Sequence, residues 1–463
     1  MIFNFNNQIG FFKRYQFIEY FFACLLGMSL LYAYESVTYS ESAQTLFRMI
    51  NEQSFVIEDG HFANYIMQFL PWVFIKLGIQ IQAVGTIFGF SYFLFYCGIF
   101  LIIKNVFLEG RIAVLFLLLL VLAVPETFFD VTSSSKQAMA IGCLYFACRQ
   151  SKVIAANRLI LVSILILLIG AGTHPIFFMY VFMVHLYQYL FEKKFDYQIG
   201  IVVVSLIFAW YIVFGKTIID CDVFNITAIN GFIKKSTLHN YLLEVFWSRY
   251  KFIGICFFFS VAYLWKTKMY KAVWGSALLV LFTYLAIFII NSSWVDYLQI
   301  QNTMFVFHFA LLVPLFFVLD KLNVQRQWLV KIGVVVSLIM SIGTLIQIDK
   351  VYKSRASRLQ YKLEVLKPLG NKFIIGEHQI DTTIFLRTND LPYETAIISA
   401  WKLNSGLTMK NMSDTIDSNQ LQMTSGIFLE GDGATIQLEQ MNKTYFDFSN
   451  QPYSVIDNGF RLK

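Results

Sequence analysis

A succession of long apolar segments constrains the fold of this chain more than any other feature. Eleven of them approach the roughly 20 residues that a helix needs to cross the hydrocarbon core of a bilayer. They cover residues 15–34, 82–103, 112–124, 137–149, 159–173, 176–191, 198–214, 252–265, 273–290, 303–319 and 332–348. Charged residues make up only 14% of the 463 positions, against about 25% in soluble domains. The sequence therefore predicts an all-α polytopic membrane protein with about 11 transmembrane helices.

The charges between these segments predict the orientation. With a cytoplasmic N-terminus, the inner loops hold fifteen basic and four acidic residues, and the outer loops up to residue 349 hold eight basic and twelve acidic residues. Cytoplasmic loops of membrane proteins carry such an excess of Lys and Arg. We therefore expect a multi-pass protein of the bacterial cytoplasmic (inner) membrane, whose first segment is a retained span. The basic residues lie in short loops rather than in a stripe, so no nucleic-acid partner is predicted.

One apolar segment, residues 62–78, does not fit this topology. Counting it as a span would invert every later loop and place the lysines outside. We interpret it as a helix in the outer interface, with Pro71 and Trp72 at its bend. The first outer region then covers residues 35–81 of a transmembrane domain that covers residues 1–349.

The composition changes after Ile348. Residues 350–463 are polar and contain strand-like runs, KFIIG at 372–376 and ATIQLEQ at 434–440, with the turn signal EGDG at 430–433. An odd number of spans places this segment outside. We expect an extracytoplasmic C-terminal domain of α/β or mostly β structure.

The first outer region holds the richest set of candidate catalytic residues. It opens with AYESVTYSES, which places Glu35 directly after the first apolar segment, and it closes with IEDGHF, which contains Glu58, Asp59 and His61. Partial desolvation raises the pKa of a carboxyl at such a boundary and makes it a usable general base. Glu35 and Asp59 are therefore the candidate bases. The alternative is that these acids are solvated loop residues that follow the charge bias.

Other outer segments contain candidate ligands for a phosphate. Lys136 follows three serines where a helix begins, an arrangement that favours phosphate oxygens, although the serines could simply cap the helix. His174 precedes Pro175 at the end of an apolar segment, where it could instead be an interfacial histidine at a helix start. Arg249 stands among aromatic residues, as does an arginine of an interfacial aromatic belt. His185, deeper in its segment, is expected to make a buried polar contact.

The sequence contains few signals for a metal or a cofactor. Its six cysteines form no CxxC pair and no Cys/His ligand spacing, so neither a zinc site nor a disulfide framework is predicted. No P-loop, GxGxxG, HExxH or GxSxG pattern occurs. Ionisable residues within the apolar segments are few, Glu19 and His308 being the main ones, which gives little support to an ion-coupled carrier.

The layout resembles the GT-C superfamily of integral-membrane glycosyltransferases. The shared features are a first span followed at once by an acidic outer region, an interfacial helix, many further spans and a C-terminal outer domain. Glu35 matches the position of that superfamily's catalytic acid in the first outer loop, as a Glu where Asp is more usual, and Asp59 is the other match. The segments GHFANYIMQFLPWVFIKLGI, FFDVTSSSKQAMAIG, THPIFF and LPYETAIIS are also similar to segments of uncharacterised bacterial multi-pass proteins.

The resemblance implies an inverting transferase of cell-envelope polysaccharide biosynthesis. It would move a sugar from a polyprenyl-phosphate-linked donor to a glycan or lipid acceptor on the outer face. Glu35 or Asp59 would be the base, and a larger set would bind substrate or phosphate, namely His61, Lys136, His174 and Arg249. A divalent metal is compatible with this chemistry, but no metal ligand is assigned.

Two other functions fit the same outline. A surface-polysaccharide polymerase or ligase would use the same lipid-linked substrates, but it normally relies on paired arginines in outer loops, and here Arg48 and Arg249 stand nearly alone. A lipid or polysaccharide transporter needs no catalytic acid.

Overall fold

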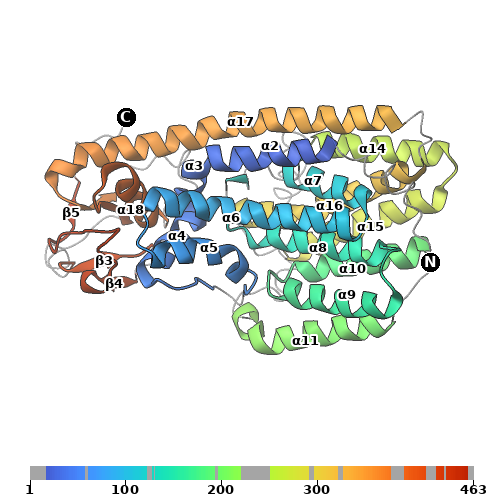
Figure 1. The fold of residues 1–463 in the computed structure, drawn as a ribbon, viewed down its shortest axis with the longest axis horizontal. Helices are drawn as coiled ribbons and strands as arrows, with labels where there is room; N and C mark the ends of the chain where they lie inside the picture. The colour runs from blue at the N-terminus through green and yellow to red at the C-terminus, as the bar shows by residue number, and fades with distance from the viewer. Residues whose placement is uncertain are drawn as a thin grey trace.

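The computed structural model describes eleven stretches of the chain. They are residues 17–57, 61–122, 128–129, 131–192, 197–219, 251–290, 297–321, 327–376, 390–412, 424–431 and 434–456. The protein is mostly helical with a few short strands. Its long helices run roughly along one axis, and the strands gather at one end of that axis (Figure 1).

The elements described in the first half of the chain are all helices. It forms α2 (Phe17–Leu31), α3 (Ala33–Val37), α4 (Ser40–Glu52), α5 (Asn64–Lys76), α6 (Ile81–Leu101) with a π-helical end (Ile102–Val106), α7 (Gly110–Leu122), α8 (Ser134–Gln150), α9 (Ala156–Ala171) and α10 (Phe177–Tyr187), which continues as a π-helix (Gln188–Glu192). The later helices are α11 (Tyr197–Ile219), α14 (Lys251–Lys266), α15 (Tyr270–Ile290), α16 (Tyr297–Lys321) and α17 (Gln327–Leu366), which ends in a 3₁₀ turn (Lys367–Leu369).

Two of these helices are long and apolar enough to cross a membrane. They are Ile81–Val106 and Val335–Leu369, which coincide with the second and the last predicted spans. Seven shorter apolar helices coincide with seven other predicted spans: Ile18–Leu31, Gly110–Val121, Arg158–Ala171, Tyr197–Ala209, Ile253–Lys266, Tyr270–Leu285 and Val306–Val318. The helical class is confirmed, and the count of 11 spans remains a prediction.

The bundle has apolar side chains both inside and outside. The described side chains of α7 and α8 are almost all buried in one large core. The surrounding helices α9, α11, α14 and α15 expose many large apolar side chains, among them Leu161, Phe208, Phe258 and Trp274. Helices that are apolar on all sides are typical of a membrane-embedded bundle.

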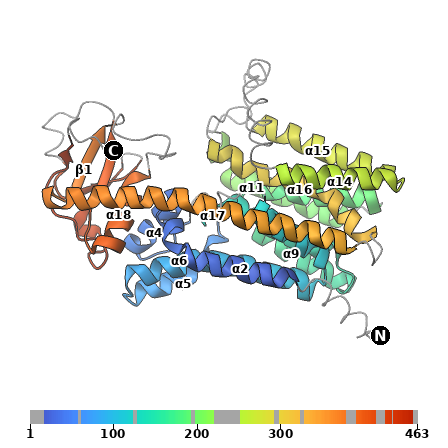
Figure 2. The ribbon, with the colours of Figure 1, turned by 90° about the horizontal axis from the view of Figure 1, so that it is seen from above.

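Helix α17 is the longest element, with 40 residues. Figures 1 and 2 show it lying along the bundle and continuing past it to the end that holds the strands. It passes through the predicted domain boundary at residues 349 and 350 without a break.

Where the structure describes them, the C-terminal residues form two small sheets and three short helical elements. Strand β1 (Lys372–Gly376) is the predicted strand KFIIG, and it pairs in parallel with β2 (Thr408–Met412) and with β5 (Ser454–Val455). Strands β3 (Ile427–Leu429) and β4 (Thr435–Gln437) pair antiparallel, and the predicted strand ATIQLEQ ends after β4 in a 3₁₀ turn (Leu438–Gln440). The helices are α18 (Leu391–Ile398) and a π-helix (Ser399–Leu403).

These C-terminal residues share one hydrophobic core with the first outer region. Phe47 of α4 packs against the rings of Tyr393, Phe428 and Phe446, with centroids 4.8 to 5.4 Å away. The same core extends into α5 and the first half of α6. We call this assembly, made of residues 33–92 and 390–456 where described, the head.

Helix α5 occupies the apolar segment that did not fit the predicted topology. It contains Pro71, packs against α6 and exposes an apolar face that includes Tyr65, Ile66 and Phe69. Its presence as a helix is confirmed, and its place in the outer interface remains a prediction.

Candidate functional site

Glu35 lies where the bundle meets the head. It belongs to the short helix α3, which follows α2 after a turn at Tyr32, and its side chain is only 7% exposed. Its charged neighbours are Asp349 and Lys353 from α17 and Lys402 from the π-helix after α18. The two carboxyls therefore come from α3 and α17, and the two lysines come from α17 and from the π-helix after α18.

The surroundings of Glu35 favour its protonated form. Burial raises the pKa of its carboxyl, and the Asp349 carboxylate raises it further. A hydrogen bond to backbone and the two lysines, Lys353 and Lys402, act in the opposite direction. This balance gives a carboxyl that holds a proton more readily than a solvated glutamate does, which suits a general base.

Asp349 is a functional candidate that the sequence interpretation missed. It is 7% exposed, and its Oδ1 has no hydrogen-bond partner within the described part of the chain. A buried carboxylate oxygen without a partner is costly in a folded protein and points to a ligand, a proton or an ion. Its signal in the sequence is its position, since it is the first residue after the last apolar segment, as Glu35 is after the first.

Aromatic rings fix the lysine that the head contributes. The Lys402 ammonium lies 4.3 Å from the ring centroid of Tyr34, and the Trp401 ring meets the same tyrosine at 5.3 Å. Gly85 of α6 leaves the room for that tryptophan, because a Cβ there would lie 2.1 Å from a Trp401 ring atom. The π-helix that carries Trp401 is therefore packed tightly against α6, beside Tyr34 and Glu35.

A buried ion pair attaches α17 to the head. The Arg355 guanidinium donates to both carboxylate oxygens of Glu394, at 2.7 and 2.5 Å, and Arg355 is 6% exposed and Glu394 0%. Ser40 donates its backbone N–H to Glu394 at 2.7 Å and its hydroxyl to Asp390 at 2.6 Å. These bonds hold Ser40 at a φ of 43°, in the left-handed region that residues other than glycine rarely adopt. We call these four residues the clamp.

A row of rings leads from the clamp back to the bundle. Arg355 lies 4.9 Å from the ring of Tyr39, which meets Tyr352 at 4.7 Å. Tyr352 stacks on Phe129 at 4.5 Å, and Phe129 contacts Tyr32 at 5.9 Å. This row packs α17 against α2 and the residues before α8, close to Glu35.

His61 and His174 form a second group. Their ring centroids are 5.8 Å apart, and the backbone N–H of Ala63 donates to the carbonyl of Gly172 at 3.1 Å. The structure thus brings together two of the predicted phosphate ligands.

The contacts of His174 favour the role at a helix start. Its Nδ1 accepts the backbone N–H of Ile176 at 3.1 Å, immediately before α10. Burial lowers its pKa to about 3, and the nearby His61 contributes in the same direction. His174 is therefore neutral at ordinary pH. The expected polar contact of His185 is confirmed, since its Nε2 lies 2.9 Å from the hydroxyl of Tyr145.

Lys136 is buried rather than presented at a surface. It is 1% exposed, and its ammonium lies 5.2 to 5.9 Å from the rings of Phe93, Tyr96 and Phe128. The hydroxyl of Ser133 accepts the backbone N–H of Lys136, as the capping interpretation of the serine run predicted.

Two predicted site residues, Asp59 and Arg249, lie outside the described residues, as does Glu58. Among the described residues, no group of three or more His, Cys, Asp or Glu side chains could hold a metal ion. Glu35 and Asp349 are the acidic side chains that the described residues offer at this junction.

Comparison with known proteins gives no further assignment, because no family model, curated protein or solved structure matches the chain.

Proposed function

We propose that this protein is a GT-C-like glycosyltransferase of the bacterial cytoplasmic membrane. It moves a sugar from a polyprenyl-phosphate-linked donor to an acceptor on the outer face. The observation that supports it best is the buried Glu35, with its raised pKa, at the junction of the bundle and the head, beside Asp349 and two lysines.

The chemistry of this group suits a single displacement. Glu35 takes the proton of the acceptor hydroxyl while the acceptor oxygen attacks the anomeric carbon, and the bond from that carbon to the phosphate oxygen breaks. The departing phosphate carries the negative charge, which the ammonium groups of Lys353 and Lys402 stabilise. Attack from the face opposite the phosphate inverts the anomeric carbon.

The apolar surface of the bundle supports a lipid-linked donor. Helices α9, α11, α14 and α15 expose large apolar side chains, and two helices are long and apolar enough to cross a membrane. A polyprenyl chain would lie among these helices and reach Glu35 laterally. We assign phosphate binding to Lys353 and Lys402 rather than to Lys136, because Lys136 is buried among aromatic rings.

The two other functions receive less support. Arg48, which a polymerase or ligase would use, lies 3.7 Å from Glu430 within the head. A lipid or polysaccharide transporter needs no catalytic acid.

The test uses cells that lack the protein. We expect a polyprenyl-phosphate-linked sugar to accumulate in their lipid extract and to return to its normal level when the wild-type chain is restored. Glu35→Gln should leave the lipid accumulated, because an amide cannot accept the proton, while Glu52→Gln, an exposed position of the same region, should restore the normal level. Full restoration by Glu35→Gln would exclude Glu35 as the base.

A further inference from the structure

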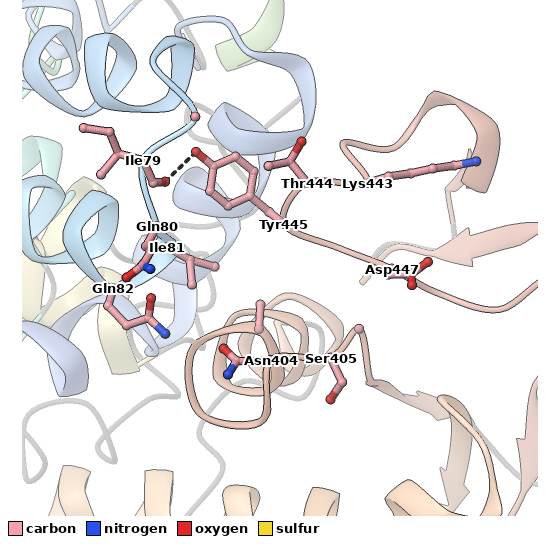
Figure 3. Close-up of a pocket in the computed structure, with 13 residues that line it drawn as sticks. Ile79, Gln80, Ile81, Gln82, Asn404, Ser405, Lys443, Thr444, Tyr445 and Asp447 are labelled. Atoms are coloured by element: carbon pink, nitrogen blue, oxygen red, sulfur yellow. Dashed lines mark hydrogen bonds between the residues drawn. The ribbon is translucent and has the colours of Figure 1, made fainter.

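A polar pocket of about 400 Å³ lies where the turn between α5 and α6 meets the C-terminal residues of the head. Figure 3 shows its walls, which come from three segments of the chain: residues 78–82, residues 400–406 and residues 443–447. Its volume is within the range of small-molecule sites. We call it the junction pocket.

Several polar side chains of the junction pocket are not used by the fold. Gln80, Asn404, Lys443 and Asp447 make no side-chain hydrogen bond within the described part of the chain, and the hydroxyl of Ser405 is buried there without a hydrogen-bond partner. The four exposed side chains offer two amides, a carboxylate and an ammonium to a ligand.

Other polar groups of the same walls hold the pocket together. The amide of Gln82 donates to the carbonyl of Trp401 at 2.8 Å, and the hydroxyl of Tyr445 donates to the carbonyl of Ile79 at 2.7 Å (Figure 3). Gly406 lies against the backbone of Asp447, where a Cβ would be 2.7 Å from a backbone atom. The walls are thus fixed by contacts that leave the unpaired groups available, which is the arrangement of a preformed site.

One short helix connects the junction pocket to Glu35 and its charged neighbours Asp349, Lys353 and Lys402, which we call the Glu35 group. The π-helix Ser399–Leu403 carries Lys402, which acts on Glu35, and Trp401, which packs on Tyr34. Ala400 and Asn404, at the two ends of the same stretch, line the pocket. The same short stretch therefore forms part of the pocket wall and carries a lysine that acts on Glu35.

We propose that the junction pocket binds the carbohydrate acceptor of the transfer reaction. The amides both donate to and accept from sugar hydroxyls, the carboxylate accepts from them and the ammonium donates to them, and an aromatic wall such as Tyr445 suits the apolar face of a sugar ring. The inference rests on the proposed function, since the ligand is an acceptor only if Glu35 transfers a sugar to it. The single ammonium and single carboxylate balance in charge, which favours a sugar over a polyanion.

The test measures binding of the full-length protein, in detergent, to a printed array of oligosaccharides that carry neutral, N-acetylated and uronic-acid sugars. We expect the wild type to bind at least one class of them. The double variant Asn404→Ala with Asp447→Ala should bind it at least about tenfold more weakly, because each substitution removes hydrogen bonds to the ligand. Glu439→Ala, on the same part of the head but outside the pocket, is the matched control and should bind within about twofold of the wild type.

The outcomes separate this proposal from the proposed function. Glu35→Gln should bind the array as the wild type does. Binding of the array together with normal lipid levels in cells that lack the protein would support the pocket and contradict the transferase. Failure of the wild type to bind any oligosaccharide would overturn the pocket, and so would undiminished binding by the double variant. Binding of a peptide array in preference to the oligosaccharides would overturn it as well.

Discussion

Glu35 and Asp349 occupy corresponding places in the sequence, each directly after an apolar segment. The fold brings them close enough for the Asp349 charge to act on the pKa of Glu35, although 314 positions separate them. Burial raises the pKa of Glu35 first, and the negative charge of Asp349 raises it further. The state of Glu35 therefore depends on residues contributed by α17 and by the head.

This dependence predicts the pH profile of the proposed transfer reaction. A base acts only when it is deprotonated, so activity falls as the pH decreases through the pKa of Glu35. Asp349→Asn removes a negative charge, lowers that pKa and should move the acidic limb of the kcat/KM profile to lower pH. Lys402→Met removes a positive charge and should move the limb to higher pH. Profiles that coincide with the wild type in both variants would show that neither residue acts on the base.

The position directly after an apolar segment made Glu35 a candidate and would also have indicated Asp349, whereas no local pattern indicates Lys402 or Glu394. An acidic residue at the end of an apolar segment can be recognised from that segment alone. The residues that interact with Lys402 and Glu394 lie far away in the chain. Burial is hard to predict for the same reason. Lys136 follows a capping serine, a pattern that fixes the helix start but not whether the ammonium points to water or into aromatic rings.

At the scale of elements, the positions of the apolar segments predicted most helices. The change of composition after Ile348 suggested a domain boundary at a point where helix α17 is continuous. Helix α17 continues to Leu366 because an apolar stripe continues through the polar residues. Ala356, Leu359, Leu363 and Leu366 recur at helical spacing, and all four are buried. Composition changed at Ile348, but the helical period did not.

The clamp makes a prediction for the attachment of this helix. Glu394→Gln leaves the Arg355 guanidinium buried without its counter-charge, which should lower the free energy of unfolding by about 3–5 kcal/mol. Chemical unfolding in detergent, followed by tryptophan fluorescence, measures it. Gln360→Ala, which removes an exposed hydrogen bond to Glu364 on the same helix, is the control and should cost about 0.5 kcal/mol or less. Equal stability of Glu394→Gln and the wild type would show that the clamp contributes nothing.

At the scale of the whole molecule, the head joins two parts of the chain that the sequence treats as separate. Phe47 from the first outer region packs among rings from residues 393–446, and Asn442 donates to the carbonyl of Ile50 at 2.9 Å. Contacts of this range leave no local pattern in a single sequence, so the shared core could not be predicted. The sequence did predict that both parts lie on the same side of the bundle.

The predicted orientation is testable with two exposed positions at opposite ends. Glu439 lies in the head, and Lys152 lies in the turn between α8 and α9, which the charge distribution places in the cytoplasm. In a chain whose native cysteines are replaced, a membrane-impermeant maleimide added to intact spheroplasts should label Glu439→Cys within minutes and label Lys152→Cys only after permeabilisation. Labelling of Lys152→Cys in intact spheroplasts would reverse the topology.

The uninterrupted α17 also restricts which changes of chain length the protein tolerates. Each residue of an α-helix advances the chain by 1.5 Å and turns it by about 100°. One residue inserted before Asp349 would rotate Asp349 and Arg355 together away from Glu35 and Glu394, although no existing residue had changed. Seven inserted residues would nearly restore the angle but would lift both side chains by about 10 Å. Deletions and insertions in residues 335–355 should therefore be far rarer among descendants of this sequence than substitutions there, because both the rotation and the height of the helix are fixed at its two ends.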